Sequence, residues 1–360
     1  MSLVTEKKRQ LVLYSIPLAG WLLFALQHEL HWKPLNILLI AVLFLCISEA
    51  VHHAEVIAHR IGQPFGSMVL ALAVTSIEVS LIVALMLAGG PEASALARDT
   101  VFAAVMIILN LMVGLSILVG GIKHNEQSFV LQGANAALII LVAISVFSFI
   151  LPNYTQTVVG PYYSNKQLVF VAIVTLILYG SFIFVQNIKH RSHFLTEFEM
   201  GEVVENRPSA KATATSTLLL FVCLGAVVVL AESLAPSLEE FIQAIGAPHS
   251  LAGVIIACVV LLPEGLTAFK AAKQNQLQKS LNLSLGSAVA SIGLTIPIVS
   301  LLAVFSGLQL TLGINAESSL LFVLSLFTII LSLSTGKTTI LHGIVLLVIF
   351  MVYLFMLIFP

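Results

Sequence analysis

Charged residues are scarce in this chain: Lys, Arg, Asp and Glu make up 9% of its 360 residues, whereas hydrophobic residues make up 59%. Soluble domains carry about 25% charged residues, so the composition excludes an ordinary soluble domain and indicates a membrane protein with many spans. Cysteine is also rare, and its three copies stand in apolar stretches as small hydrophobic residues, which argues against a disulfide framework. A formal net charge of -1 gives no support for a nucleic-acid partner. No small-residue cleavage site follows the first apolar run, so we expect no cleavable signal.

Long apolar runs fill most of the chain. A spanning helix needs about 20 mainly apolar residues, and the bilayer is therefore the expected surroundings of each run. The sequence predicts an all-α fold with eleven transmembrane helices, at about 11–28, 35–54, 66–88, 100–121, 130–152, 167–187, 215–234, 250–271, 281–305, 317–334 and 338–359.

The positive charges between these runs predict the orientation. If the N-terminus is cytoplasmic, all 16 Lys and Arg residues lie on the inner side except Lys33, Arg98 and Lys166. Such a bias is typical of cytoplasmic loops, and one missed or invented helix would destroy it. We therefore expect a multi-pass protein of the cytoplasmic (inner) membrane, with the C-terminus outside.

Two similar halves follow the first helix. When Glu78 is aligned on Glu264 without gaps, Ala71 pairs with Ala257 and Val74 with Val260. Each half holds five spans, and because five is odd, the second half enters the membrane from the opposite side, as an inverted repeat. The predicted segments are 1–34 (N-terminal segment and first helix), 35–187 and 215–360 (the two repeats), and a cytoplasmic linker at 188–214. The linker carries an acidic run without the spacing of a calcium loop, which favours a solvated connection.

Glu78 and Glu264 each stand in the middle of an apolar span. A charged side chain at the bilayer centre is unfavourable by about 3 kcal/mol or more, so these two carboxyls are the predicted cation- and proton-binding residues. Pro263 cannot donate a backbone hydrogen bond, and it should free a carbonyl near Val259 as a neutral ligand. Both glutamates should bind the transported metal ion.

Other polar residues could support this pair. Thr75 lies on the helical face of Glu78, and Asn110, Ser284 and Ser287 follow the two glutamate helices near mid-membrane. For these residues a role as cation ligands and a role in helix packing both stay open. The cluster of His52, His53, Glu55 and His59 lacks the spacing of a zinc site, and it more readily forms the inner end of a span or a pH-sensitive edge.

Charge balance indicates an exchange mechanism. Two ionised carboxylates neutralise one Ca²⁺, and two protons neutralise the same carboxylates. The empty dianion is strongly disfavoured in a low dielectric, so Ca²⁺ and protons should alternate. A monovalent Na⁺(K⁺)/H⁺ antiporter using the same site is the alternative, since Na⁺ leaves one glutamate protonated. A membrane metalloenzyme using the histidines is a remote alternative, and inverted repeats make a channel a poorer interpretation. We expect no bound cofactor and no enzymatic activity; the partners are inorganic cations, protons and the lipid bilayer.

These residues resemble the cation/Ca²⁺ exchanger superfamily, in its Ca²⁺/H⁺ exchanger branch, and are most similar there to the bacterial ChaA-type antiporters. The similar stretches run over nearly the whole chain and lie at 54–67, 77–81, 98–100, 263–265, 282–287 and 334–337. The resemblance implies eleven helices, two inverted five-helix repeats, and one acidic residue per repeat that binds cation and proton in turn. Those roles fall on Glu78 and Glu264.

Overall fold

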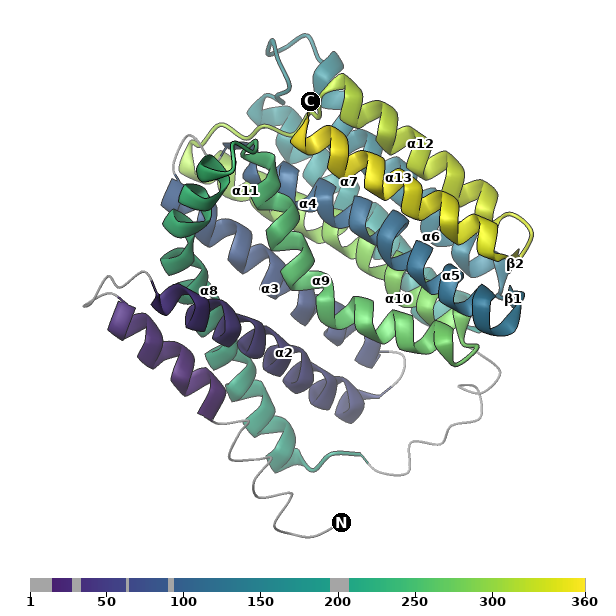
Figure 1. Ribbon diagram of the computed structural model, residues 1–360, viewed down its shortest axis with the longest axis horizontal. Helices are drawn as coiled ribbons and strands as arrows, with labels where there is room; N and C mark the ends of the chain where they lie inside the picture. The colour runs from purple at the N-terminus through teal and green to yellow at the C-terminus, as the bar shows by residue number, and fades with distance from the viewer. Residues whose placement is uncertain (1–14, 28–33, 63–64, 90–93, 195–206, 360) are drawn as a thin grey trace. The chain divides into compact units, whose positions relative to one another are not determined.

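The computed structural model describes residues 15–27, 34–62, 65–89, 94–194 and 207–359, and it confirms the all-α fold (Figure 1). Within these ranges, ten helical segments are long and apolar enough to cross a membrane, and a shorter apolar helix covers Ser15–Gln27. The first half contains α2 (Leu35–Ile61), α3 (Phe65–Gly89), α4 (Leu96–Met106) with η2 (Ile107–Met112) and α5 (Val113–His124), α6 (Leu131–Ser145) with η3 (Val146–Ile150) and η4 (Leu151–Tyr154), and α7 (Asn165–Phe184) with η5 (Val185–Lys189) and η6 (Arg191–His193).

The second half repeats this order of helices. It contains α8 (Ala210–Ala244), α9 (Ser250–Lys273), α10 (Leu277–Ala290) with η7 (Ser291–Thr295) and α11 (Ile296–Ser306), α12 (Ala316–Leu333) and α13 (Ile340–Ile358). The short strands β1 (Gln127–Ser128) and β2 (Lys337–Thr338) pair antiparallel. The third helix of each half contains a π-helical segment, η2 in one and η7 in the other. The segments η3 and η5 are also π-helical, whereas η4 and η6 are 3-10 helices.

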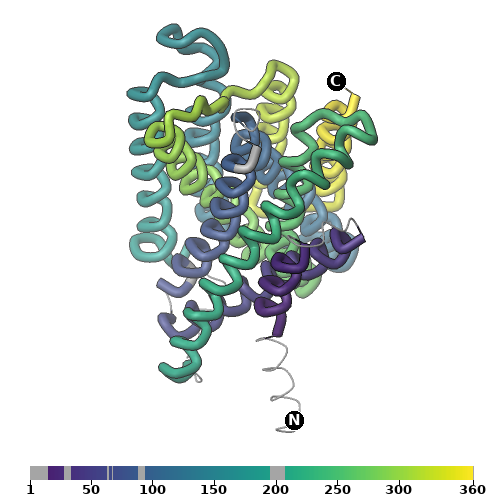
Figure 2. The backbone as a smooth tube through the Cα atoms, turned by 90° about the vertical axis from the view of Figure 1, so that its left-hand side faces the viewer, coloured from purple at the N-terminus to yellow at the C-terminus, as the bar shows by residue number. Residues whose placement is uncertain are grey.

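Most predicted spans agree with the helices to within a few residues, but two end too early. The span predicted at 35–54 continues to Ile61, and the span predicted at 215–234 begins at Ala210 and continues to Ala244. Figure 2 shows α8 as one continuous helix, and Pro236 lies within it. The helix start at Ala210 also shortens the predicted linker 188–214. The acidic run of that linker and residues 11–14 and 28 of the first predicted span lie outside the described residues.

The helices form two compact units. Unit 1 contains the helix at Ser15–Gln27 together with α2, α3 and α8, and in it α2 packs against both α3 and α8. Unit 2 contains α4–α7 and α9–α13. Each unit thus combines helices from both halves of the sequence.

Small residues bring the helices of unit 2 close together. A Cβ atom at Gly253 in α9 would lie 2.6 Å from the carbonyl carbon of Asp99 in α4. A Cβ atom at Gly343 in α13 would lie 2.8 Å from the carbonyl oxygen of Gly114 in α5. Since real Cβ atoms do not approach so closely, glycine is required at both contacts, as is common where membrane helices pack.

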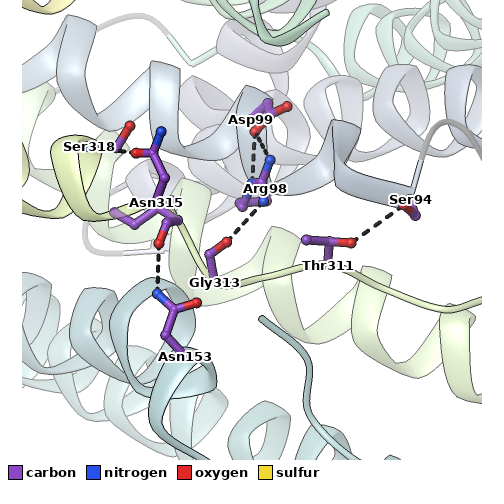
Figure 3. A network of polar contacts seen from close by, with 9 residues as sticks. Ser94, Arg98, Asp99, Asn153, Thr311, Gly313, Asn315 and Ser318 are labelled. Carbon is purple, nitrogen blue, oxygen red and sulfur yellow. Dashed lines mark hydrogen bonds and ion pairs between the residues drawn. The ribbon is translucent and has the colours of Figure 1, made fainter. Parts of the chain in front are cut away.

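An extended segment after α11 connects several elements at one end of unit 2 (Figure 3). The Arg98 guanidinium donates from Nη1 to the Gly313 carbonyl at 2.9 Å, and Asn153 donates from Nδ2 to the Ile314 carbonyl at 2.6 Å. The Thr311 backbone N–H donates to the Ser94 carbonyl at 3.0 Å. These bonds satisfy backbone groups that no helix would pair, and they fix the start of α12, where the Asn315 side chain accepts from the Ser318 N–H at 2.8 Å.

Candidate functional site

The first predicted carboxyl, Glu78, lies inside unit 1. It stands in the middle of α3 and is 5% exposed, and Thr75, one turn earlier, is 4% exposed. Val74 and Ile82 are buried on the same helix, whereas Ser76 is exposed and donates its hydroxyl to the Leu72 carbonyl. The helix therefore buries its polar Thr75–Glu78 face, as expected for a functional carboxyl.

The residues of the histidine cluster lie on different faces of α2. His53 is 3% exposed, and neither of its ring nitrogens has a hydrogen-bond partner among the described residues. Glu55 and His59 are exposed on other faces of the helix. Nowhere in the described ranges do three His, Cys, Asp or Glu side chains form a group that could hold a metal ion. His53 is thus buried in unit 1, and sequence reasoning missed this because it treated the cluster as one feature.

The second predicted carboxyl, Glu264, lies in unit 2 and has a direct partner. It stands in α9, and the Ser287 hydroxyl of α10 donates a hydrogen bond to its Oε2 atom. Glu264 itself is partly exposed. A hydroxyl that donates to a carboxylate stabilises the ionised form, and its oxygen can also coordinate a cation. The structure therefore places Ser287 beside Glu264, and its role as a cation ligand stays a prediction.

A π-helical segment lies close to Glu264. In η2, the Met112 side chain lies 3.5 Å from where a Cβ atom of Gly265 would be. Asn110, in the same segment, is fully buried and donates from Nδ2 to the Ser325 hydroxyl at 3.0 Å and to the Met106 carbonyl at 3.2 Å. The Asn110 amide oxygen has no partner in the described part of the chain. π-helical segments often occur at functional sites, and this one leaves a buried neutral oxygen free to accept.

The remaining predicted residues differ in their surroundings. Ser284 is fully buried, one turn before Ser287 on α10, and its hydroxyl makes no hydrogen bond within the described residues. Pro263 lies inside α9, and its own carbonyl accepts from the Thr267 hydroxyl at 2.9 Å. Val259 is partly buried on the same helix. The proline ring offers no donor to the Val259 carbonyl, so that oxygen stays a predicted ligand.

The predicted residues fall into two groups. Glu78 and Thr75 belong to unit 1, whereas Glu264 and its partner Ser287 belong to unit 2, with Asn110. A shared site for the two glutamates therefore stays a prediction. Ser325 was missed, because no local pattern connects it to Asn110, which is 215 residues away in the chain.

The chain is similar to known ion transporters over nearly its whole length. The family described as "Sodium/calcium exchanger protein" matches residues 34–187 and 215–359. The "Putative ionic transporter y4hA" of Sinorhizobium fredii is 42% identical over 95% of this chain and 94% of its own length. The "Sodium-potassium/proton antiporter ChaA" of Escherichia coli is 36% identical over 89% of this chain and 87% of its own length. The crystal structure of the "H+/Ca2+ Exchanger CAX" has the same fold, with a TM-score of 0.72 at 17% identity, covering 98% of this chain and 88% of that one.

Proposed function

Because the chain belongs to the sodium/calcium exchanger family, whose members are cation antiporters, we propose that it exchanges Ca²⁺ for H⁺ across a membrane through Glu78 and Glu264. In this proposal the two carboxylates bind one Ca²⁺ in one half of the cycle and one proton each in the other half. The protein alternates between states open to either side. The proposed membrane is the cytoplasmic membrane, with the N-terminus inside and the C-terminus outside.

The observation that carries the proposal is the hydrogen bond from Ser287 to Glu264. It joins a titratable carboxyl on α9 to a hydroxyl oxygen on α10, so the same place offers a proton acceptor and an additional metal ligand. Ca²⁺ prefers six to eight oxygen ligands, which carboxylates, the free Asn110 amide oxygen, the Ser284 hydroxyl and water can supply. The second carboxyl of the proposal, Glu78, is 5% exposed on α3.

Electrostatics explains why the two ions would alternate. A site holding two bare carboxylates in a low dielectric is unfavourable because of both burial and mutual repulsion. The protein therefore changes its side of access only when Ca²⁺ or protons neutralise the site. Coupling then follows from charge and needs no separate gate.

Proton competition gives a direct check of this coupling. Since both ions use the same oxygens, the apparent affinity for Ca²⁺ should fall as the pH is lowered. The measurement is Ca²⁺-dependent flux in proteoliposomes at several fixed pH values. An affinity that stays constant from alkaline to mildly acid pH would separate the proton site from the metal site.

A monovalent Na⁺(K⁺)/H⁺ antiporter is the second candidate, and the 36% identity to a relative with that name favours it. Sodium carries a single charge, so one glutamate would keep its proton. The deciding experiment uses everted vesicles or proteoliposomes with a pH-sensitive dye inside, to which Ca²⁺, Na⁺ and K⁺ are added separately. Proton movement with Ca²⁺ supports the first proposal, and movement with Na⁺ or K⁺ alone supports the second. No proton movement with any of them, in protein shown to be folded, would contradict both.

A further inference from the structure

Unit 2 contains a pocket away from Glu264, at the end where α4, α9 and α12 begin and α13 ends. Its volume is about 220 Å³. Asp99 in α4, Glu317 in α12 and Tyr353 in α13 contribute polar groups, whereas Phe102 and Leu321 are among the apolar residues of its wall. None of these residues belongs to the proposed exchange site.

The pocket carries a net negative charge. Arg98 is its only cationic side chain in the described lining, and this guanidinium is already engaged. Its Nε donates to Asp99 Oδ1 at 2.8 Å, and Nη1 donates to the Gly313 carbonyl (Figure 3). The Glu317 carboxylate has no hydrogen-bond or ion-pair partner among the described residues, and it is exposed at the rim. The charge of the pocket therefore favours the binding of a positively charged group.

Tyr353 supplies an independent sign of a ligand. It is 4% exposed, it lines the pocket, and its hydroxyl makes no hydrogen bond to any described residue. The hydroxyl oxygen itself reaches the pocket, so it can donate to or accept from a molecule that fills it. The Tyr353 ring also packs edge-to-face on Phe102, with ring centroids 5.8 Å apart.

Size and lining decide the kind of cation. A bare metal ion would leave room for several waters in a pocket of this volume. A metal ion also gains nothing from Phe102, Leu321 and Met356, which form much of the wall. An ammonium ion with a short hydrocarbon part matches each kind of group in the lining. Its charge can pair with a carboxylate, donate to a hydroxyl and be attracted to an aromatic ring, and its hydrocarbon part can fill the apolar space.

We propose that this pocket binds a small organic ammonium ion, with its charge between Glu317 and Tyr353 and its hydrocarbon part against Phe102 and Leu321. The source is either a free amine or the headgroup of an ethanolamine lipid, which share this chemistry. The site is independent of the proposed ion exchange.

The test is calorimetric titration of the purified full-length protein in detergent with n-butylammonium chloride. The comparison titrants are 1-butanol, which lacks the charge, and KCl and CaCl₂, which lack the hydrocarbon part. Glu317→Gln and Tyr353→Phe should each weaken butylammonium binding about fivefold, because each removes one polar contact of moderate strength. Glu126→Gln, a change at an exposed carboxylate elsewhere in unit 2, and Glu264→Gln should leave the binding unchanged.

Two results would overturn the proposal. Butylammonium binding that is insensitive to both Glu317→Gln and Tyr353→Phe would show that it binds elsewhere or not at all. Equal sensitivity of CaCl₂ or KCl binding to Glu317→Gln would make the pocket a site for inorganic cations. Repeating the titration in nanodiscs of phosphatidylglycerol and of phosphatidylethanolamine identifies the source. Weaker binding in the ethanolamine lipid indicates that its headgroup competes, and equal binding indicates a free amine.

Discussion

The hydrogen bond from Ser287 to Glu264 leads to a quantitative prediction for Ser287→Ala. A hydrogen bond to a charged group contributes about 1.5–3 kcal/mol. Ser287 donates, so it stabilises the ionised carboxylate, and without it Glu264 holds a proton more tightly. Since about 1.4 kcal/mol corresponds to one pH unit and Glu264 is partly exposed, we expect the lower end of the range. The pH of half-maximal cation-driven proton flux should rise by about one unit in this mutant.

The assay is dye-reported proton flux in proteoliposomes, measured from mildly acid to alkaline pH. Ser280→Ala is the matched control, because Ser280 lies on the same helix and is buried, and its hydroxyl makes no hydrogen bond within the described residues. Ser287→Thr keeps the hydroxyl and should retain the original profile. A profile unchanged in Ser287→Ala, or shifted equally in Ser280→Ala, would refute the assigned role of this bond.

Three further predictions concern the glutamates and the helix α9. Glu78→Gln and Glu264→Gln should each abolish exchange in folded, inserted protein, because glutamine can neither titrate nor neutralise a cation. Pro263→Ala should weaken Ca²⁺ transport more than Na⁺ transport while proton dependence persists, because it restores a helical hydrogen bond to a carbonyl that Ca²⁺ needs more. Gly253→Ala should lower the melting temperature in detergent, because its Cβ atom would lie 2.6 Å from backbone of α4, and overpacking of this kind destabilises by about 1–3 kcal/mol.

Each of these predictions has its own contrary result. Substantial exchange in a glutamine mutant would remove that glutamate from the mechanism. Equal loss of Ca²⁺ and Na⁺ transport in Pro263→Ala, or no loss, would show that the freed carbonyl is not a ligand. Gly286→Ala is the control for Gly253→Ala, since the nearest atom to its added Cβ lies 4.0 Å away. Similar melting temperatures for these two mutants would contradict the close contact between α4 and α9.

The sequence predicted the helices well because hydropathy follows burial in the bilayer directly. It failed at the ends of α2 and α8, where polar residues such as Arg60 and Glu239 continue the helix. Their low hydropathy predicts the end of a membrane span. A helix can nevertheless continue into water, because its backbone hydrogen bonds are formed within the helix. The π-helical segments could not be predicted at all, because η2 and η7 are as apolar as the α-helices around them.

The candidate site was predictable only in part. A carboxyl such as Glu264 is conspicuous in an apolar span, because an ionisable group at that position is unfavourable and is rarely found there without a function. Neutral partners carry no such signal, so Ser287 could be proposed only as one of two alternatives. The contact of Asn110 with Ser325 depends on tertiary packing between η2 and α12, which no local pattern encodes.

The π-helical segment η2 has a consequence for how much change in length this helix tolerates. A π turn contains one residue more than an α turn, so every residue beyond Met112 is rotated by about 100° relative to an uninterrupted α-helix. Deletion of a single residue within Ile107–Met112 removes this extra residue and also moves every later residue back by one position, so the two rotations cancel and a regular helix results with α5 still facing α13. Gly114 would then keep its place against α13, where its Cβ position lies 3.3 Å from the Gly343 carbonyl oxygen. This helix can therefore lose one residue within η2 without changing the face that meets α13.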